Sequence, residues 1–251
     1  MNKSTVLITG ATAGIGEATA ELLAENGFRL ILTGRRNERL EELKTRIGKI
    51  TPVYTLCFDI RIKKEVYSAV DSLPSEWRNI DVLVNNAGLA AGLDFFHEGN
   101  VDDWEQMIDT NLKGLLYISR KITPGMIDRG AGHIVNLGSI AGREMYEKGN
   151  IYSATKHAVE ALSRGMRIDM LKHGIRVSTI SPGMVETEFA IVRFKGDSNK
   201  AKEPYKGMMP LSGRDVAEAV LFIITRPPHV SVHDLLLMPT AQAAALIVRR
   251  E

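Results

Sequence analysis

The sequence predicts an α/β protein in which a doubly wound parallel sheet of about seven strands carries helices on both faces. Short apolar runs alternate with segments of helical periodicity along all 251 residues, and this alternation is typical of parallel sheets. The apolar runs are nearly continuous, as in strands that are buried on both sides. There is no linker, low-complexity tract or change of composition, so we expect one domain over residues 1–251.

The strands and helices follow from local pattern. Strands are expected at 5–9, 29–33, 53–58, 80–88, 133–139, 176–183 and 232–238, and helices at 15–26, 37–47, 62–72, 151–173 and 216–225. Gly27 is placed to end the first helix, and Asn37 to cap the second. Cys57 lies in an apolar strand, where we expect it to be buried as a small hydrophobic residue.

One segment departs from this regularity. Residues 184–210 contain Gly, Pro, Lys and Met with weak periodicity. A long irregular segment in a regular domain is often a lid or binding loop. We therefore expect 184–210 to cover the ligand cleft and the helices near 190–205 to be more mobile without ligand.

The composition excludes several classes of protein. The formal net charge is +2, with acidic and basic residues mixed along the chain, so no charge pattern suggests nucleic acid or a membrane as partner. The single cysteine excludes an internal disulfide framework and suits a reducing compartment. No run approaches the roughly 20 apolar residues of a membrane span. We expect a soluble cytoplasmic protein.

A metal site is not expected. His229 and His233 are four residues apart, but they lie in an apparent turn and strand rather than on one helix. No carboxylate or cysteine cluster joins them, as a zinc site would require.

A glycine-rich loop stands between the first strand and the first helix. It reads TGATAGIG at residues 9–16. Its glycines allow a tight turn and a close approach to a ligand, and the following helix offers free N–H groups to an anion. A strand before and a helix after such a loop is the context of a dinucleotide site. The spacing G-x-x-x-G-x-G differs from the common G-x-G-x-x-G pattern.

A phenol and an ammonium group lie on one helical face further along the chain. Tyr152 and Lys156 are four residues apart in NIYSATKHAVEAL, so they are neighbours on the helix. Tyrosine has an ordinary pKa of about 10 and is a poor base at neutral pH. A nearby ammonium favours the phenolate and lowers that pKa. Such a tyrosine could exchange a proton with an alcohol.

Together, these motifs resemble the classical short-chain dehydrogenase/reductases. The resemblance rests on TGATAGIG, NNAG at 85–88, and YSATK with Ser139 thirteen residues before Tyr152, and it spans nearly the whole chain. It implies a Rossmann-type fold with an NAD(P) cofactor. It also implies four catalytic residues: Asn111, Ser139, Tyr152 and Lys156. The implied cofactor residues are Gly10, Thr12, Gly14, Ile15, Gly16, Arg35, Arg36, Asp59, Asn86, Ala87, Gly88, Tyr152, Lys156, Pro182, Gly183, Val185 and Thr187.

The end of the second strand favours NADP over NAD. NAD sites of this kind place an acid there, about 20 residues past the glycines. In LTGRR, Gly34 occupies the acid's position and Arg35 and Arg36 follow. A guanidinium can bind a 2′-phosphate that an acid would repel. Arg35 is the better candidate because it adjoins the strand end.

The substrate is predicted from a finer resemblance. The runs SIAGREMYEKGNIYSATK and PGMVETEFAIVRFKGD resemble the branch that contains NADP-dependent dehydrogenases of serine, allo-threonine and related 3-hydroxy acids. Such substrates carry a carboxylate, which needs a cation or several donors. Ser139 and Tyr152 would hold the reacting oxygen, and Arg143 could reach the carboxylate. Arg193 and Lys195 could close over the carboxylate or over the cofactor phosphate.

Two other functions stay open at this point. The family also contains NADPH-dependent ketoreductases of carrier-bound 3-oxoacyl chains and of small ketones. A dinucleotide-binding regulator without chemistry is the alternative outside enzymes, although it would not need all four catalytic residues. The family resemblance further implies a homotetramer that pairs two long helices, and LKGLLYISRKI and the 151–173 helix are apolar enough for this.

Overall fold

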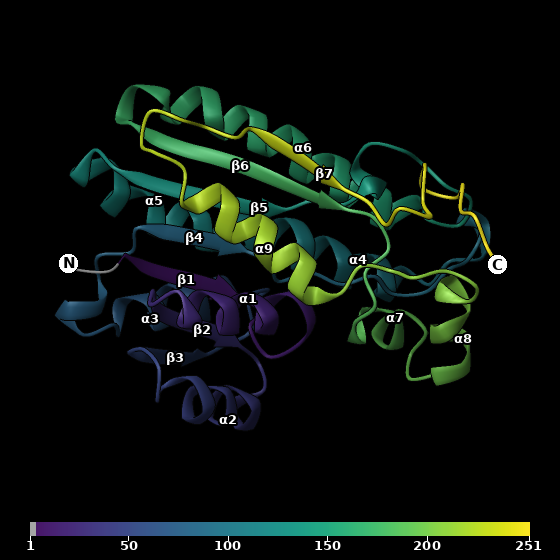
Figure 1. Cartoon of the computed structure of the whole chain (residues 1–251), viewed down its shortest axis with the longest axis horizontal. Coiled ribbons are helices and arrows are strands. Elements are labelled where there is room, and N and C mark those ends of the chain that lie inside the picture. The colour runs from purple at the N-terminus through teal and green to yellow at the C-terminus, as the bar shows by residue number, and fades with distance from the viewer. Residues whose placement is uncertain (1–3) are drawn as a thin grey trace.

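A single sheet of seven parallel strands forms the centre of the protein (Figure 1). The computed structural model describes residues 4–251, and residues 1–3 of the expected domain lie outside the described part. The spatial order is β3-β2-β1-β4-β5-β6-β7, and every neighbouring pair is parallel. The strands are β1 (Thr5–Thr9), β2 (Arg29–Gly34), β3 (Val53–Cys57), β4 (Val82–Asn85), β5 (Gly132–Leu137), β6 (Ile175–Pro182) and β7 (Asp234–Leu237). The predicted doubly wound fold is confirmed.

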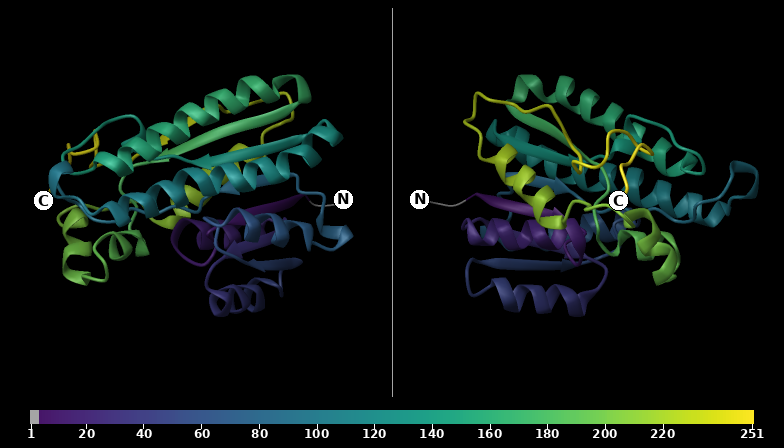
Figure 2. Two further views of the ribbon diagram at one scale, coloured as in Figure 1. Left: turned by 180° about the vertical axis from the view of Figure 1, so that it is seen from behind. Right: turned by 45° about the vertical axis from the view of Figure 1, so that its right-hand side comes forward.

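Helices cover both faces of this sheet (Figures 1 and 2). One face is covered by α1 (Gly14–Glu25), α2 (Asn37–Ile47) and α9 (Gly213–Ile224), whose apolar side chains share a core with the sheet. The other face is covered by α3 (Lys63–Asp71), α5 (Leu115–Arg129) and α6 (Asn150–Met170). These two cores leave the carboxyl ends of the strands open for ligands, as in other sheets of this type.

Several of the remaining elements gather at those carboxyl ends. They include α4 (Val101–Ile108), the π-helical turn η3 (Asp109–Gly114), α7 (Glu188–Arg193) and α8 (Ser198–Lys202). The short 3₁₀ turns are η1 (Ser75–Trp77), η2 (Phe96–Glu98), η4 (Ile140–Gly142), η5 (Leu171–His173) and η6 (Glu203–Tyr205). In Figure 1, α7 and α8 lie on the right, at the opposite end of the sheet from the N-terminus.

Three local predictions can be compared with the structure. Gly27 follows the end of α1 with φ +76°, a conformation that suits glycine, as expected. The prediction for Asn37 is wrong: the residue is already inside α2, and the carbonyl of Arg36 accepts the helical bond from Leu40 N. Cys57 is exposed rather than buried, because it ends edge strand β3 and faces the side opposite to buried Leu56.

No helix within residues 4–251 is both long and apolar enough to cross a membrane.

Candidate active site

A cavity of about 570 Å³ opens at the carboxyl ends of the strands. Most of the predicted site residues line it: Gly10, Thr12, Gly14, Ile15, Arg35, Arg36, Asn86, Ala87, Gly88, Ser139, Tyr152, Lys156, Pro182, Gly183, Val185 and Thr187. Gly16, Asp59, Asn111 and Arg143 are not among the lining residues. The glycine-rich loop and the segment around Thr187, more than 170 residues apart in the sequence, therefore line the same cavity.

The glycine loop is shaped by contacts that leave no room for side chains. Gly10 has φ +66°, and a Cβ there would lie 2.9 Å from Ala87 Cα. A Cβ on Gly16 would collide with the carbonyl oxygen of Gly10. Asn86 fixes the loop from β4, because its Nδ2 donates to Thr9 O at 2.9 Å and to Gly10 O at 3.1 Å. Gly16 and Asn86 thus support the loop's shape.

The first turn of α1 fits a phosphate group. Its N-cap residue, Ala13, has no side-chain oxygen and makes no capping hydrogen bond. The N–H groups of this turn are thus left without a side-chain cap beside the cavity, where the helix dipole favours an anion. A narrow, glycine-lined cradle at such a helix end is suited to the pyrophosphate of a dinucleotide.

Two arginines lie at the other end of this cradle, as predicted. Arg36 donates from Nε to Thr12 Oγ1 at 3.2 Å and from Nη1 to Glu188 Oε2 at 3.0 Å. Arg39 donates to the other oxygen of Glu188 at 2.7 Å, and these bonds hold the pKa of Glu188 below its usual value. Arg35 is half exposed, and its nearest acid is Asp59 at 3.7 Å. A 2′-phosphate would find two guanidinium groups here and no acid on β2.

The first turns of α6 carry Tyr152 and Lys156 into the cavity wall. Both are buried, with 9% and 7% of their surfaces exposed. Lys156 Nζ donates to Leu137 O at 2.8 Å and lies 5.9 Å from the centroid of the Tyr152 ring. Ser139 lies two residues beyond the end of β5, where its Oγ accepts a hydrogen bond from Ala141 N at 3.1 Å. The three side chains therefore share one corner of the cavity.

Burial shifts the pKa values of Tyr152 and Lys156. It raises the pKa of Tyr152 above its usual value, while the Ser139 hydroxyl and the Arg193 guanidinium act in the opposite direction. Burial also lowers the pKa of Lys156 to about 8, against the effect of Glu160. The expected lowering of the Tyr152 pKa is thus not found in the ligand-free protein, because removal of the phenolate from water has the larger effect.

Asn111 acts behind the cavity wall. It is buried in the π-helical turn η3, and its side chain exchanges two 2.8 Å hydrogen bonds with the backbone of Leu89. Its Nδ2 also donates to Thr155 Oγ1 at 3.1 Å on α6. Asn111 therefore ties η3 to the helix of Tyr152 and to the loop after β4. A π-helical turn at this point is common near functional sites.

Arg143 does not reach the cavity. Its Nε lies 3.9 Å from Oε1 of Glu160, a buried carboxylate on α6 that also accepts from Ser181 Oγ at 2.5 Å. Sequence distance from Ser139 suggested that Arg143 could meet a substrate carboxylate. The 3₁₀ turn after Ser139 instead directs it toward Glu160, behind the catalytic corner.

Several lining residues carried no sequence signal. Phe189 on α7 packs edge-on against Tyr152, with ring centroids 5.5 Å apart. Tyr205 on η6 donates to Val185 O at 2.9 Å, and Gln242 near the C-terminus accepts from Met184 N at 2.8 Å. The expected lid segment 184–210 contributes much of this wall. Phe189 and Tyr205 lie in the segment expected to cover the cleft, but no pattern marked either residue individually, and Gln242 lies outside every motif of the sequence.

The part of the chain that the structure describes has no group of three or more His, Cys, Asp or Glu side chains able to hold a metal ion.

Comparison with known proteins places this site in a family. The family model described as short chain dehydrogenase matches residues 4–197. The chain belongs to this family, and with it to the oxidoreductases that act on CH–OH groups, so the predicted family and enzyme class are confirmed.

Individual relatives resemble the chain over its whole length. The NADP-dependent 3-hydroxy acid dehydrogenase YdfG of Salmonella typhimurium is 48% identical over 247 residues, which are 98% of this chain and 99% of the relative. Sulfoacetaldehyde reductase 2 of Chromohalobacter salexigens is 44% identical over 248 residues, 98% of each protein. A solved structure, the closed form of serine dehydrogenase complexed with NADP⁺, has a TM-score of 0.92 and 47% identity. It covers 98% of this chain and 100% of that one.

Proposed function

We propose that this enzyme uses NADP to oxidise small 3-hydroxy acids, such as L-serine, L-allo-threonine and 3-hydroxypropionate, at the 3-carbon. The observation that carries the proposal is the meeting of Tyr152, Lys156 and Ser139 in one cavity with the glycine-rich loop. The relatives support the substrate class, since a 3-hydroxy acid dehydrogenase and a serine dehydrogenase are both close to half identical.

NADP is the cofactor that the residues fit. The first turn of α1 would hold the pyrophosphate, and Arg35 and Arg36 the 2′-phosphate. Lys156 and Tyr152 lie where the ribose and nicotinamide end would be placed. Asn86, Ala87, Gly88 and Asp59 would form the adenosine side, with Asp59 outside the cavity wall but within reach of Arg35. Pro182, Gly183, Val185 and Thr187 would enclose the nicotinamide from β6.

The chain's own groups handle the proton. The substrate hydroxyl would be held between Ser139 Oγ and the Tyr152 oxygen, and its proton would pass to the Tyr152 phenolate while the 3-carbon gives up a hydride. When bound, NADP⁺ would supply the hydride acceptor and a positive charge that favours the phenolate. The Lys156 ammonium, fixed by Leu137 O, adds a second positive charge that favours the phenolate. Asn111 keeps the helix that carries both groups in place.

The product has a predictable fate. Oxidation at the 3-carbon places a carbonyl β to the carboxylate. Such 3-oxo acids lose carbon dioxide readily, so an amino-acid substrate would give an amino ketone or amino aldehyde and carbon dioxide.

A kinetic panel tests the proposal. Small hydroxy acids, uncharged alcohols and sugars are each assayed with NADP and NAD by the nicotinamide absorbance at 340 nm. We expect turnover of 3-hydroxy acids with NADP and much less with NAD. Turnover of uncharged alcohols but not of 3-hydroxy acids would refute the substrate class. No turnover with any substrate would favour the non-catalytic regulator.

A second candidate is the reduction of sulfoacetaldehyde. It is favoured by the 44% identity with sulfoacetaldehyde reductase 2 over nearly the full length of both chains. Sulfoacetaldehyde with NADPH belongs in the same panel, and a higher kcat/KM for it than for any 3-oxo or 3-hydroxy acid would make it the leading function. A 3-oxoacyl carrier substrate is less favoured, because an acidic carrier would need a basic docking surface and the formal net charge of this chain is only +2.

We further propose a cytoplasmic homotetramer. A lone cysteine suits the cytoplasm. The outer face of α6 and η5 supports assembly, because Ala161, Gly165, Ile168 and Leu171 form an exposed apolar stripe along it. Light scattering should give the mass of four chains; a monomer mass would contradict the tetramer.

A further inference from the structure

Four cations line the cavity, and three of them have an evident role. Arg35 and Arg36 lie at the end of β2, next to Asp59 and Glu188. Lys156 is directed to Leu137 O beside the catalytic tyrosine. The fourth is Arg193, at the end of α7. Within residues 4–251 it has no carboxylate within 4 Å, so its charge is not neutralised by the protein.

Arg193 is held firmly in place. Its carbonyl accepts from Gly92 N at 3.0 Å, and its Nε donates to Gly92 O at 3.3 Å. The guanidinium lies over the rings of Tyr146 and Tyr152, 5.5 and 5.8 Å from their centroids. These contacts use the backbone, Nε and the faces of the group. Neither Nη donates a hydrogen bond in the part of the chain that is described. The side chain is therefore held through Nε, and both Nη groups can donate to a ligand.

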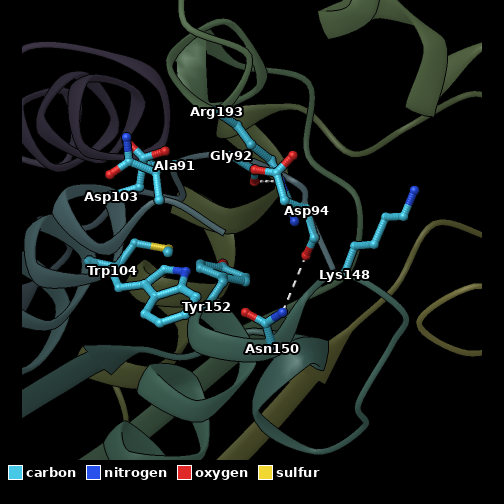
Figure 3. Close-up of a pocket in the computed structure, with 11 residues that line it drawn as sticks. Ala91, Gly92, Asp94, Asp103, Trp104, Lys148, Asn150, Tyr152 and Arg193 are labelled. Carbon is cyan, nitrogen blue, oxygen red and sulfur yellow. Dashed lines mark hydrogen bonds between the residues drawn. The ribbon is translucent and has the colours of Figure 1, made fainter. Parts of the chain in front are cut away.

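Two acids line a small pocket to which Arg193 also contributes. Figure 3 shows Asp94 and Asp103 around a small pocket beside Tyr152 and Arg193. Asp103 is paired with Lys195, whose Nζ lies 2.8 Å from Oδ2. Asp94 makes no ion pair with Arg193 within the described residues. The pocket itself holds about 10 Å³, room for a single water, so the substrate must occupy the main cavity.

We infer that Arg193 is the residue that recognises the anionic end of the substrate, a carboxylate or a sulfonate one carbon away from the reacting carbinol. This inference rests on the proposed function and deepens it. In 3-hydroxypropionate the carbinol carbon, one methylene and the carboxylate carbon follow in sequence. In the alcohol of sulfoacetaldehyde the sulfur takes the place of the carboxylate carbon. One guanidinium beside Tyr152 therefore serves both candidate substrates.

The chemistry of arginine explains the selectivity. Its planar fork binds two oxygens of one anion at once. A neutral substrate would leave the guanidinium without a partner in a partly buried site, and loss of such charged hydrogen bonds is costly. Because Nε is fixed to Gly92 O, the fork cannot turn away to solvent without breaking that bond. Arg193 would thus reject neutral alcohols while it orients acids for hydride loss.

The test compares an acid with its own ester. The dissociation constants of 3-hydroxypropionate, 2-hydroxyethanesulfonate and methyl 3-hydroxypropionate are measured by calorimetry on enzyme loaded with NADPH, which cannot oxidise them. kcat/KM is measured in parallel with NADP⁺. We expect Arg193→Met to weaken binding of both anions by about 10- to 100-fold, as for loss of a charged hydrogen-bond pair, and to change ester binding by less than about 2-fold.

Lys195→Met is the matched control. It removes the same charge from the same segment. The expectation that Lys195 could close over the carboxylate or the cofactor phosphate does not agree with the structure, where Lys195 pairs with Asp103 and does not line the cavity. It should leave the preference for acid over ester unchanged, and NADPH affinity should be the same in both variants. Equal losses for acid and ester in Arg193→Met, or an unchanged preference, would overturn the inference. If the parent binds the anions through Arg193 but oxidises none of them, the proposed reaction fails while the recognition stands.

Discussion

At the residue scale, burial opposes the charged forms of both Tyr152 and Lys156 in the catalytic corner. The pKa of Tyr152 is raised and that of Lys156 is lowered, each chiefly by removal from water. A neutral phenol is a poor base, and a lysine whose pKa is lowered is less often present as the ammonium that would favour the phenolate. The site therefore needs additional positive charge near the phenol before proton transfer from an alcohol becomes favourable.

Removal of one oxygen tests the role of Tyr152. Tyr152→Phe should lower kcat by about 10²- to 10⁴-fold, the usual contribution of general acid–base catalysis, because no other group at the corner can exchange the proton. NADP affinity, measured by fluorescence titration, should change little. Tyr54→Phe makes the same chemical change on β3, where Tyr54 packs against Trp77 and does not line the cavity, and it should retain most activity. Substantial turnover by Tyr152→Phe would rule out the mechanism.

Arg35 is the cleaner probe of cofactor choice. Arg36 also holds Thr12 and Glu188, so its loss would disturb the glycine loop as well. Arg35 makes only a 3.7 Å contact with Asp59, and 52% of its side chain is exposed. Arg35→Ala should weaken NADP binding by about 10-fold or more and leave NAD binding unchanged. An unchanged ratio of the two dissociation constants would show that Arg35 does not contact the 2′-phosphate.

At the element scale, the sequence predicted the regular parts well. Predicted and observed strands and helices mostly agree within one to three residues, because apolar periodicity is a local property that the fold preserves. The site residues carried by a strand end or helix, such as Tyr152 and the glycine loop, were also correctly placed at the cavity.

The failures share one cause, which is that side-chain direction depends on contacts distant in sequence. Arg143 turns to Glu160 on α6, and Cys57 faces outward on an edge strand. Arg36 takes the cap position expected for Asn37 because its side chain is held by Thr12 and Glu188. The contact of Phe189 with Tyr152 and the wall formed by the C-terminal residues could not be predicted, since no local pattern marks those residues individually.

The lid segment is fastened at its start by one carboxylate. Glu188, the first residue of α7, is bonded to Arg36 and Arg39, which flank the expected site of the 2′-phosphate. Glu188→Gln should weaken this attachment. We expect faster amide hydrogen exchange over residues 188–205 in the ligand-free variant than in the parent, by a few-fold at most, because exposed ion pairs are worth about 1 kcal/mol or less.

Glu203→Gln provides the comparison, because Glu203 is an exposed acid of the same segment whose partner is its neighbour Lys206. Its exchange should match the parent. Bound NADP should slow exchange over 188–205 in every variant if this segment closes over the cofactor. Identical exchange in Glu188→Gln and the parent would show that the ion pairs do not hold the lid.

At the scale of the whole molecule, a buried histidine should make the fold sensitive to acid. His133 on β5 is almost fully buried, and its Nε2 lies 2.8 Å from Ser178 Oγ. Burial, with a smaller effect of Arg176, lowers the pKa of His133 to about 3. In the unfolded chain its pKa is near 6.5, so below that pH the unfolded state takes up a proton that the folded state excludes. Stability is therefore lost as pH falls from about 6.5 toward 3.

Denaturation by urea at pH 7 and pH 4.5 measures this effect. His133 alone should lower the free energy of unfolding by about 3 kcal/mol between these values, from two pH units at 1.36 kcal/mol each. His133→Gln keeps a polar group near Ser178 but cannot titrate, so its loss over the same interval should be smaller by about that amount. Equal losses in the variant and the parent would assign the acid sensitivity to other groups.

The most direct test of the account follows the hydride itself. L-Serine carrying two deuterium atoms on its 3-carbon is incubated with the enzyme and NADP⁺, and the reduced cofactor is analysed by mass spectrometry. If Tyr152 removes the hydroxyl proton while the 3-carbon gives up a hydride, the NADPH gains one mass unit, and the rate falls relative to unlabelled serine when this step limits turnover. NADPH of ordinary mass formed from the labelled serine would contradict hydride transfer from the 3-carbon.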